Sequence, residues 1–556
     1  MAMLRQLGCP TLFLTLSCAE YDWLTLLKEI VETVERRKVS QDYIENLPAK
    51  EKNRLISENV VITTLHFQKR IDKLFALMKH DFFVGPYKTY HVSTYYYRVE
   101  FQQRGSPHIH ALVWLKDQDD KDAPNFWVNC DDKEEVNIDE IQRRLNKVEE
   151  FADQIVSTSP ELMRCENHNT SDDENSNSCT ECKYLQEKVK HFQCHSHTFT
   201  CEKKKKFITI KENEGHGRLD GKSKGPELRN IPVCRFHFPK WPMNETKVVL
   251  QVSKEIEDEE LKKRKTDLCK VRKFLLRQTF KENGIIQEDK MNTLKSLSFW
   301  EFLYEAGMFE SCKEFNEHTS LEKDNAKVRY LNALSVSVQG KACVVLKRSV
   351  KDIFINGYNG LIMRLQNANH DIQIVIDPFT AGQYVCGYMT KNEAGQSRFL
   401  QAVNEEMKGI KAMEKLNALA SVLDKSREVS IQEAVYRILG LPMTKSSIVV
   451  KYISTVHPNF RDGLLKSNLE EIEESDSVFH NSPVDYYESR PEKSDQPNII
   501  YNEAELVPDY WNDITFSEFW SQYEIVYKNQ VEVSKEKNKK KQKLYHLKMG
   551  VISVVD

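Results

Sequence analysis

The sequence predicts an α+β fold in which a central antiparallel sheet carries helices on its faces. In residues 94–115 the first half alternates polar and apolar side chains, the second half from Ile109 to Leu115 is β-branched and apolar, and a Gly-Ser-Pro turn lies between them, a pattern typical of two paired strands. Residues 11–17 form another alternating stretch, and residues 19–37 follow it with helical periodicity. Residues 116–240 interrupt this order and are rich in Cys and His, which indicates an insertion. A mostly helical C-terminal region follows.

Composition sets the class of protein. The 556 residues are 40% hydrophobic and 29% charged, enough for two or more globular cores. No stretch approaches the ~20 apolar residues of a membrane span, and the N-terminus lacks the pattern of a secretory signal. The net charge is −3, so contacts with a nucleic acid must come from local basic patches. We therefore expect a soluble protein with no membrane partner.

The predicted hairpin gathers candidate metal ligands. His108 and His110 are two residues apart, so both side chains leave the same face of a strand. Glu100 and Gln102 share a face of the partner strand, and facing side chains on neighbouring strands lie about 5 Å apart. Two imidazoles with Glu100 or Gln102 form a candidate site for Mg, Mn or Zn. The alternative is that a His-X-His pair on a strand is merely polar surface.

A second candidate element follows the strand predicted at residues 371–377. If residues 381–391 are helical, Tyr384, Tyr388 and Lys391 lie on one stripe of the helix. Tyrosine is a poor base, with a pKa of about 10, but its oxygen can attack a metal-polarised phosphodiester and keep the phosphorus covalently. Lys391 could stabilise the charge that develops on the phosphate. Tyrosines at this spacing are also common in cores and on surfaces.

Five stretches of the chain, in this order, carry a resemblance to a known family: residues 8–17, 100–110, 234–239, 384–391 and 427–437. They resemble the HUH endonucleases, specifically the two-tyrosine, Rep-like nuclease domain of Helitron transposases. The resemblance covers about residues 5–460. It implies a sheet of the HUH/Rep type, in which the first strand lies beside the His-X-His strand.

The resemblance also implies metal-dependent nicking of single-stranded DNA, with Mg or Mn at the two histidines. In this chemistry one tyrosine attacks the scissile phosphate, a 3′-hydroxyl is released and the 5′ end stays on the enzyme. A second tyrosine then accepts another strand, as in rolling-circle transposition. Here these roles fall to Tyr384 and Tyr388, with Lys391 beside the phosphate. Arg98 and Arg104, next to a run of tyrosines, are candidate contacts for unpaired DNA.

The Cys/His-rich insertion predicts a structural zinc site. Thirteen Cys in a chain without a secretory signal favour reduced thiols and metal ligands over disulfides. A Cys-X-X-Cys pair followed by His-X-His-X-X-X-Cys has the spacing of zinc ligands. The preferred ligands are Cys179, Cys182, His197 and Cys201, followed by His195 and Cys234. The alternative is a Cys/His-rich loop without metal.

These patterns divide the chain into four regions. Residues 1–115 are the first part of the Rep-like core, residues 116–245 the insertion, and residues 246–460 a helical region with the second part of the core. Residues 461–556 hold an acidic linker, a small aromatic segment and a basic tail, which is a candidate nuclear address. We therefore expect the protein in the nucleus.

The sequence has no Gly-X-X-X-X-Gly-Lys-Ser/Thr loop, the phosphate-binding motif of an ATP-driven helicase. The helicase of complete Helitron proteins would therefore act in trans or within a longer parent protein. Two other functions stay open from the sequence. A domesticated or decayed copy could bind DNA without cutting it, and a zinc-dependent interaction protein would use the Cys/His cluster alone. A histidine-triad hydrolase is excluded because the third alternate position holds Leu112.

Overall fold

The computed structural model confirms the α+β class. It describes residues 2–85, 88–101, 105–124, 138–165, 179–198, 201, 207–212, 227–279, 281–282, 285–286, 288–310, 313–338, 340–376, 429–448, 483–488, 511–516, 518–519, 523–528 and 542–547. The chain divides into two units, one of Met1–Gly8 with Ser446–Asp556 and the other of Cys9–Lys445. Among the described helices, none combines the length and the apolarity that crossing a membrane requires.

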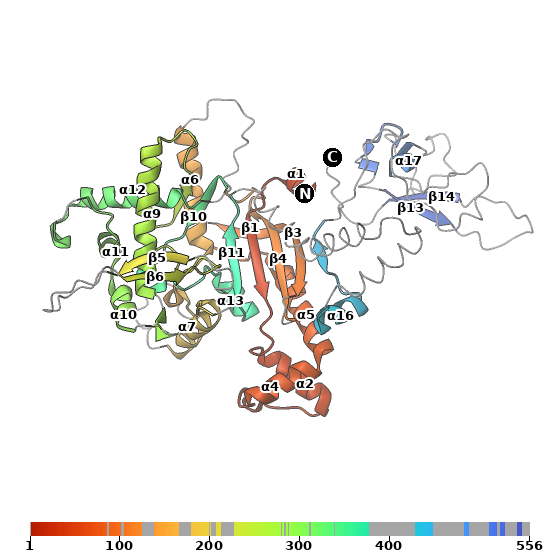
Figure 1. The fold of residues 1–556 in the computed structure, drawn as a ribbon. Coiled ribbons are helices and arrows are strands. Elements are labelled where there is room, and N and C mark those ends of the chain that lie inside the picture. Colours follow the sequence, from red (N-terminus) through yellow and green to blue (C-terminus); the bar gives the residue numbers. More distant parts are fainter. Residues whose placement is uncertain are drawn as a thin grey trace, which may run out of the picture. The chain divides into compact units, whose positions relative to one another are not determined.

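An antiparallel sheet forms the centre of the larger unit (Figure 1). Its strands run in the order β11-β1-β4-β3-β12, and β2 pairs with β3. Their bounds are β1 Leu12–Ser17, β2 Phe83–Val84, β3 Thr89–Phe101, β4 Pro107–Asp117, β11 His370–Ile374 and β12 Thr444–Ser446. The predicted hairpin is thus confirmed as β3 and β4, both longer than the sequence indicated, and β1 lies beside β4 as the resemblance implied.

Helices cover one face of this sheet. They are α2 (Leu24–Glu35), α3 (Gln41–Glu45), α4 (Ala49–Glu58) and α5 (Val60–Met78), and Figure 1 shows α5 running beneath the strands. Leu12, Leu14 and Leu16 of β1 point into this core, where they meet side chains of α2 and α5. Because side chains alternate along a strand, the residues between them face the opposite side of the sheet. The sheet therefore has one face packed against these helices and a second face with a different set of side chains.

Trp23 ties the start of α2 to the C-terminal half of the unit. Its buried indole Nε1 donates to the carbonyls of Gln366 and Asn367, at 3.0 and 3.1 Å. These carbonyls end helix α13 (Gly360–Gln366), which leads into β11. Trp23 also stops the predicted helix from starting at residue 19, because it is the N-cap residue of α2 in an extended conformation.

The distant helix α16 (Ile431–Ile438) packs on α5, as Figure 1 shows. Its buried Tyr436 donates from the hydroxyl to Gln68 Oε1 at 3.0 Å, and Gln68 Nε2 donates to the Tyr97 hydroxyl at 3.3 Å. Gln432 lies against Gly105 at the tip of the hairpin, where φ is +87° and a Cβ atom would clash with the glutamine side chain. Helix α16, more than 300 residues away along the chain, thus packs against α5 and against the turn of the hairpin.

The insertion and the helical region that follows it build further layers of the larger unit. Capping boxes at Ser298 and Thr319 start two of these helices. Phe302 and Tyr330 lie at the centre of their core. The elements are α6 Ile138–Ile155, α7 Thr180–Gln193, β5 Phe207–Glu212, β6 Glu227–Pro232, β7 Lys247–Leu250, α9 Asp258–Thr279, β8 Lys281–Glu282, β9 Ile285–Ile286, α10 Glu288–Ser296, α11 Phe299–Glu305, α12 Ser320–Ser335 and β10 Ala342–Val345.

The smaller unit contains α1 (Ala2–Leu7), α17 (Pro483–Glu488), β13 (Tyr523–Lys528) and β14 (Gln542–Leu547). Strands β13 and β14 pair as an antiparallel hairpin. Part of the predicted basic tail is therefore a strand.

Short 3-10 turns, at Pro160–Leu162, Phe315–Glu317 and Val350–Asp352, complete the elements of the larger unit.

Replacing Tyr436 with Phe tests the support that α16 gives to the sheet. Tyr436→Phe leaves the buried Gln68 oxygen without its donor, so we expect a loss of about 1–2 kcal/mol in the free energy of unfolding. Chemical denaturation measures this loss. Ile438→Ala on the same helix is the matched control, because Ile438 is 83% exposed and should cost little. Equal stability of Tyr436→Phe and wild type would contradict this role.

Candidate functional site

The hairpin β3–β4 gathers the predicted metal ligands on one face of the sheet. In the antiparallel register, His108 lies opposite Glu100 and His110 lies opposite Arg98. The register confirms that Glu100 shares a face with both histidines, and Glu100 Oε2 lies 3.0 Å from His110 Nε2. Gln102 and Arg104 lie outside the described residues.

The neighbouring strand β1 orients both imidazole rings. Ser17 Oγ lies 3.0 Å from His108 Nδ1, and Thr15 Oγ1 lies 3.3 Å from His110 Nδ1. The ring of Phe13 stacks on His110 at a centroid distance of 5.8 Å. A hydrogen bond at Nδ1 fixes the rotation of a histidine and directs its Nε2 toward a metal. The sequence did not single out Ser17 and Thr15 for this role, although their alternation with Leu16 is visible in it.

Burial sets the charge of His108. Loss of solvent, together with the nearby His110, lowers the pKa of His108 to about 4, while Glu100 acts in the opposite direction. The imidazole is therefore neutral at physiological pH. Only the neutral ring can bind a metal ion, so this environment suits a ligand.

Arg98 brings a positive charge to the same face of the sheet. It lies directly across from His110 and is partly exposed. A guanidinium at this place can donate two parallel hydrogen bonds to the oxygens of a phosphate. Of the two arginines predicted to contact DNA, the structure brings Arg98 to the histidine pair.

The predicted nucleophiles Tyr384 and Tyr388, with Lys391, lie outside the described residues. The strand that precedes them in sequence is β11, which pairs with β1. In that pairing Asp371 lies opposite Thr15, and Thr15 in turn lies opposite His110. The last described residues before the tyrosines therefore run two strands away from β4.

The insertion separates the predicted zinc ligands into two groups, so the preferred set of four is corrected. His197 and Cys201 lie with His195 and Cys234, whereas Cys179 and Cys182 lie with Cys165. The physical reason is α7, whose 14 residues stand between the two groups and span roughly 20 Å at the helical rise per residue. Spacing along the sequence suggested one site because it did not take this rigid helix into account.

The first group has the contacts of a compact donor set. His195 Nε2 lies 3.2 Å from His197 Nδ1, Cys234 Sγ lies 3.4 Å from His195 Nε2, and Cys201 Sγ lies 3.5 Å from His197 Nδ1. Both cysteines are buried, and the ring of Phe238 stacks on His195. In the part of the chain that the structure describes, the compact groups of Cys, His and acidic donors are this group and the Cys165 group. The His108 pair with Glu100 is a looser arrangement.

Comparison with known families gives a match over the N-terminal part of the chain. Residues 1–113 match the family model described as "Helitron helicase-like domain at N-terminus". Residues 1–113 are thus similar to the N-terminal domain of Helitron proteins. In those proteins this is the Rep-like endonuclease region, so the match confirms the resemblance over residues 1–113, and residues 114–460 lie outside it. It covers about a fifth of the chain and includes Glu100, His108 and His110. No curated protein and no solved structure matches the chain.

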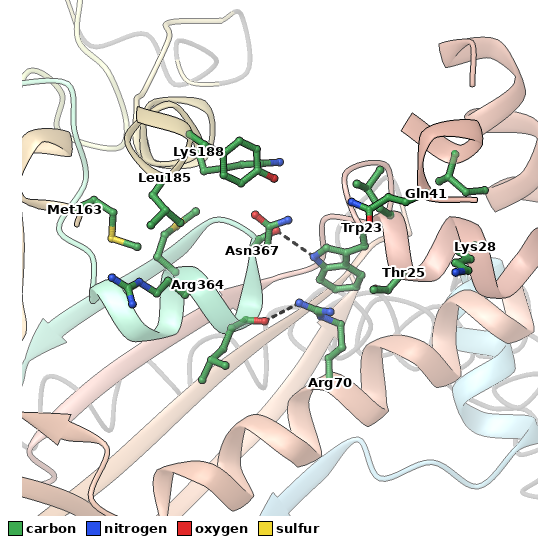
Figure 2. A pocket seen from close by; sticks show the side chains of 15 residues that line it. Trp23, Thr25, Lys28, Gln41, Arg70, Met163, Leu185, Lys188, Arg364 and Asn367 are labelled. Carbon is green, nitrogen blue, oxygen red and sulfur yellow. Dashed lines mark hydrogen bonds between the residues drawn. The ribbon is translucent and has the colours of Figure 1, made fainter. Parts of the chain in front are cut away.

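A cavity of about 420 Å³ lies among helices α2, α5, α7 and α13 (Figure 2). Its lining includes Trp23, Arg70 and Asn367, and Figure 2 shows the hydrogen bonds that Trp23 and Arg70 donate into the end of α13. Trp23 packs in the core with Leu16, whereas Ser17 and the two histidines belong to the other face. The cavity is therefore separate from the histidine site.

His370 joins the insertion to the edge strand β11. The ring is fully buried, its Nε2 accepts the backbone N–H of Asn359 at 3.0 Å, and its Nδ1 lies 3.0 Å from the Gln193 side chain at the end of α7. Burial lowers the pKa of His370 to about 4, against a smaller opposing effect of the Ala368 backbone. The folded protein therefore holds this ring neutral.

Acid should weaken the fold through His370. Its folded pKa of about 4 lies below the ordinary value of 6.5, so the unfolded chain takes up the proton first as pH falls. The stabilisation is present above pH 6.5 and is lost between about pH 6.5 and 4, by about 3 kcal/mol. Urea denaturation across this range should show a shallower decline for His370→Gln. His80→Gln, at an exposed histidine, should follow wild type, and parallel profiles for all three proteins would contradict the prediction.

Removing the Ser17 hydroxyl should loosen the metal site without removing a ligand. Because Ser17 fixes the His108 ring, we expect Ser17→Ala to weaken Mn²⁺ binding about 10- to 100-fold. Titration followed by electron paramagnetic resonance measures this affinity. Ser17→Thr keeps the hydroxyl and should restore binding, while Ser93→Ala on β3 should leave it unchanged. Unaltered affinity in Ser17→Ala would exclude this positioning role.

Proposed function

We propose that this chain is a Helitron-type endonuclease that nicks single-stranded DNA and transfers strands through a 5′-phosphotyrosine. The observation that supports this proposal is the hairpin, where two imidazoles, a carboxylate and a guanidinium share one face within residues that match the Helitron family. This combination suits phosphoryl transfer, because a cation held by the ligands and the guanidinium can both neutralise charge around a phosphate.

In this proposal His108, His110 and Glu100 hold a divalent cation, with Gln102 as the alternative oxygen ligand. Two imidazoles and a carboxylate suit Mn²⁺, and Mg²⁺ is the other candidate. The bound ion supplies a Lewis acid that polarises the scissile phosphodiester. If Gln102 were the third ligand, its neutral amide would offset less of the cation's charge than the Glu100 carboxylate. The choice of third ligand therefore affects the affinity for the metal as well as the identity of the ligand.

The bond exchange falls to the predicted tyrosines. The phenol oxygen of Tyr384 or Tyr388 bonds to phosphorus and gives up its proton to solvent, while the bond from phosphorus to the 3′ oxygen breaks. That oxygen takes up a proton and leaves as a 3′-hydroxyl, and the 5′ phosphate stays on the tyrosine. Lys391 and Arg98 stabilise the charge on the phosphate. The phosphodiester of the DNA is exchanged for a phosphodiester that joins the DNA to tyrosine, so rejoining the strand needs no nucleoside triphosphate.

Single-stranded DNA is the substrate, and a helicase acting in trans or in a longer parent protein would provide it. The helicase-like description of the matched family fits such a partnership. The nucleus is the location that this function requires in a compartmented cell.

We also propose a structural zinc ion at His195, His197, Cys201 and Cys234, because two imidazoles and two thiolates form a common tetrahedral zinc set.

A second candidate function is DNA binding without cleavage, in a domesticated or decayed copy. It is favoured by one observation, that the donors at His108, His110 and Glu100 are less compact than those of the insertion. Such a protein would keep the sheet and Arg98 but would form no covalent adduct. A zinc-dependent interaction protein would also form no adduct, and its function would depend on the insertion alone.

Adduct formation separates these functions. Incubation of labelled single-stranded oligonucleotides with the full chain and Mn²⁺ should give a protein–DNA adduct that survives denaturant. We expect Tyr384→Phe or Tyr388→Phe to reduce the adduct and the double variant to abolish it, because the attacking oxygens are gone. His108→Ala should lower the rate at least 100-fold through the lost metal ligand.

The control is an oligonucleotide-binding measurement on the same variants. Normal binding by the double tyrosine variant shows that the loss is chemical rather than structural. Adduct that persists without both tyrosines would exclude them as nucleophiles. Tight binding with no adduct from wild type would favour the non-cutting alternative.

A further inference from the structure

The insertion contains a second convergence of thiols, at the start of α7. Cys179 is the N-cap residue of this helix and Cys182 lies in its first turn, while Cys165 reaches them from the segment after α6. Cys182 Sγ lies 3.5 Å from Cys165 Sγ, and Cys165 Sγ lies 3.8 Å from Cys179 Sγ. The three donor atoms all lie within 4.8 Å of one another.

These separations match metal coordination and exclude a disulfide in this structure. A bonded pair of sulfurs lies about 2.05 Å apart, far closer than either distance. Zinc binds thiolate sulfur at about 2.3 Å, so neighbouring sulfurs of a regular tetrahedron lie about 3.8 Å apart. The thiols therefore already have the spacing of three corners of a zinc site.

The surroundings favour charged sulfur at these positions. The backbone N–H of Cys165 donates to Cys182 Sγ at 3.3 Å, and the N-terminus of the 14-residue α7 presents its positive end to Cys179 and Cys182. Cys165 and Cys182 are buried, so three thiolates gathered here would repel one another in the absence of a cation. Soft thiolate donors select zinc over hard cations such as Mg²⁺.

We propose that Cys165, Cys179 and Cys182 bind a second zinc ion, separate from the ion proposed at the His195 group. Cys179 is the partly exposed member, which leaves the solvent side of the trio for a fourth ligand. The proposal does not rest on the nuclease function, because neither α7 nor these cysteines contribute to the hairpin.

The second ion would fix the beginning of α7 as the first fixes the chain beyond its end. Between them, Val189 and Phe192 of α7 pack against Ile355, Tyr358 and Met363. The backbone bonds from Asn356 to Gln193 and from His195 to Phe354 join the same two segments. In this proposal the two ions hold both ends of α7, which docks part of the insertion onto the chain leading into β11.

The zinc content of the full chain tests this proposal. The protein is purified under reducing conditions without chelator, and bound zinc is counted by elemental analysis and native mass spectrometry. We expect two zinc ions per chain in wild type, one in Cys179→Ser, one in Cys201→Ser and none in the double variant. Cys269→Ser is the matched control, because this exposed cysteine lies outside both groups and should leave two ions bound.

Cys179→Ser is chosen because its partly exposed side chain contributes little to packing, and circular dichroism checks that it folds. Cobalt substitution gives a second readout, since the thiolate-to-metal absorption should fall in Cys179→Ser while the signal of the first site stays. A zinc count that Cys179→Ser does not lower would overturn the proposal. So would a disulfide between Cys165 and Cys182 in the freshly reduced protein. Neither result depends on DNA cleavage. If the zinc count contradicts this proposal, the proposed nuclease function is still tested separately by adduct formation.

Discussion

Backbone pairing of β1, β4 and β3 is the constraint on which the hairpin site depends. Side chains on these strands share a face only through the antiparallel register. A shift of one residue in either ladder would turn the histidines into the apolar core and expose Ile109 in their place. The ladder thus determines both which side chains are buried in the core and which lie on the opposite face of the sheet. In this sheet a stable fold and the gathering of the ligands have the same origin.

The two faces of the sheet have different roles: one packs in the core, and the other carries the candidate metal ligands. One face buries leucines and aromatic rings against α2 and α5, and this packing holds the strands in register. On the other face Ser17 and Thr15 orient the imidazoles, while burial keeps His108 neutral. The orienting hydroxyls lie on β1, whose other residues are Leu and Phe. Ser17 and Thr15 look in the sequence like ordinary residues of a buried strand, but they orient the neighbouring imidazole rings.

The insertion follows a different physical rule. One part of it is built around α7, a helix with Cys and His donors at both ends and an apolar stripe between them. That stripe packs on the segment that leads into β11, and the buried His370 joins the two. The insertion is thus attached to the edge of the same sheet that carries the hairpin. Stability of the insertion and the position of β11 are coupled through this attachment.

The sequence alone determined the α+β class, the hairpin, the shared face of His108, His110 and Glu100, and the presence of candidate metal ligands among the Cys and His of the insertion. These follow from local rules, because strand alternation and ligand spacing are properties of neighbouring residues. It could not assign the cysteines to their groups, since a helix of 14 residues keeps Cys182 and His195 apart. Nor could it show that Ser17 orients His108, or that α16 supports the turn at Gly105. Those contacts join segments from tens to hundreds of residues apart, and only the packing of the whole chain decides them.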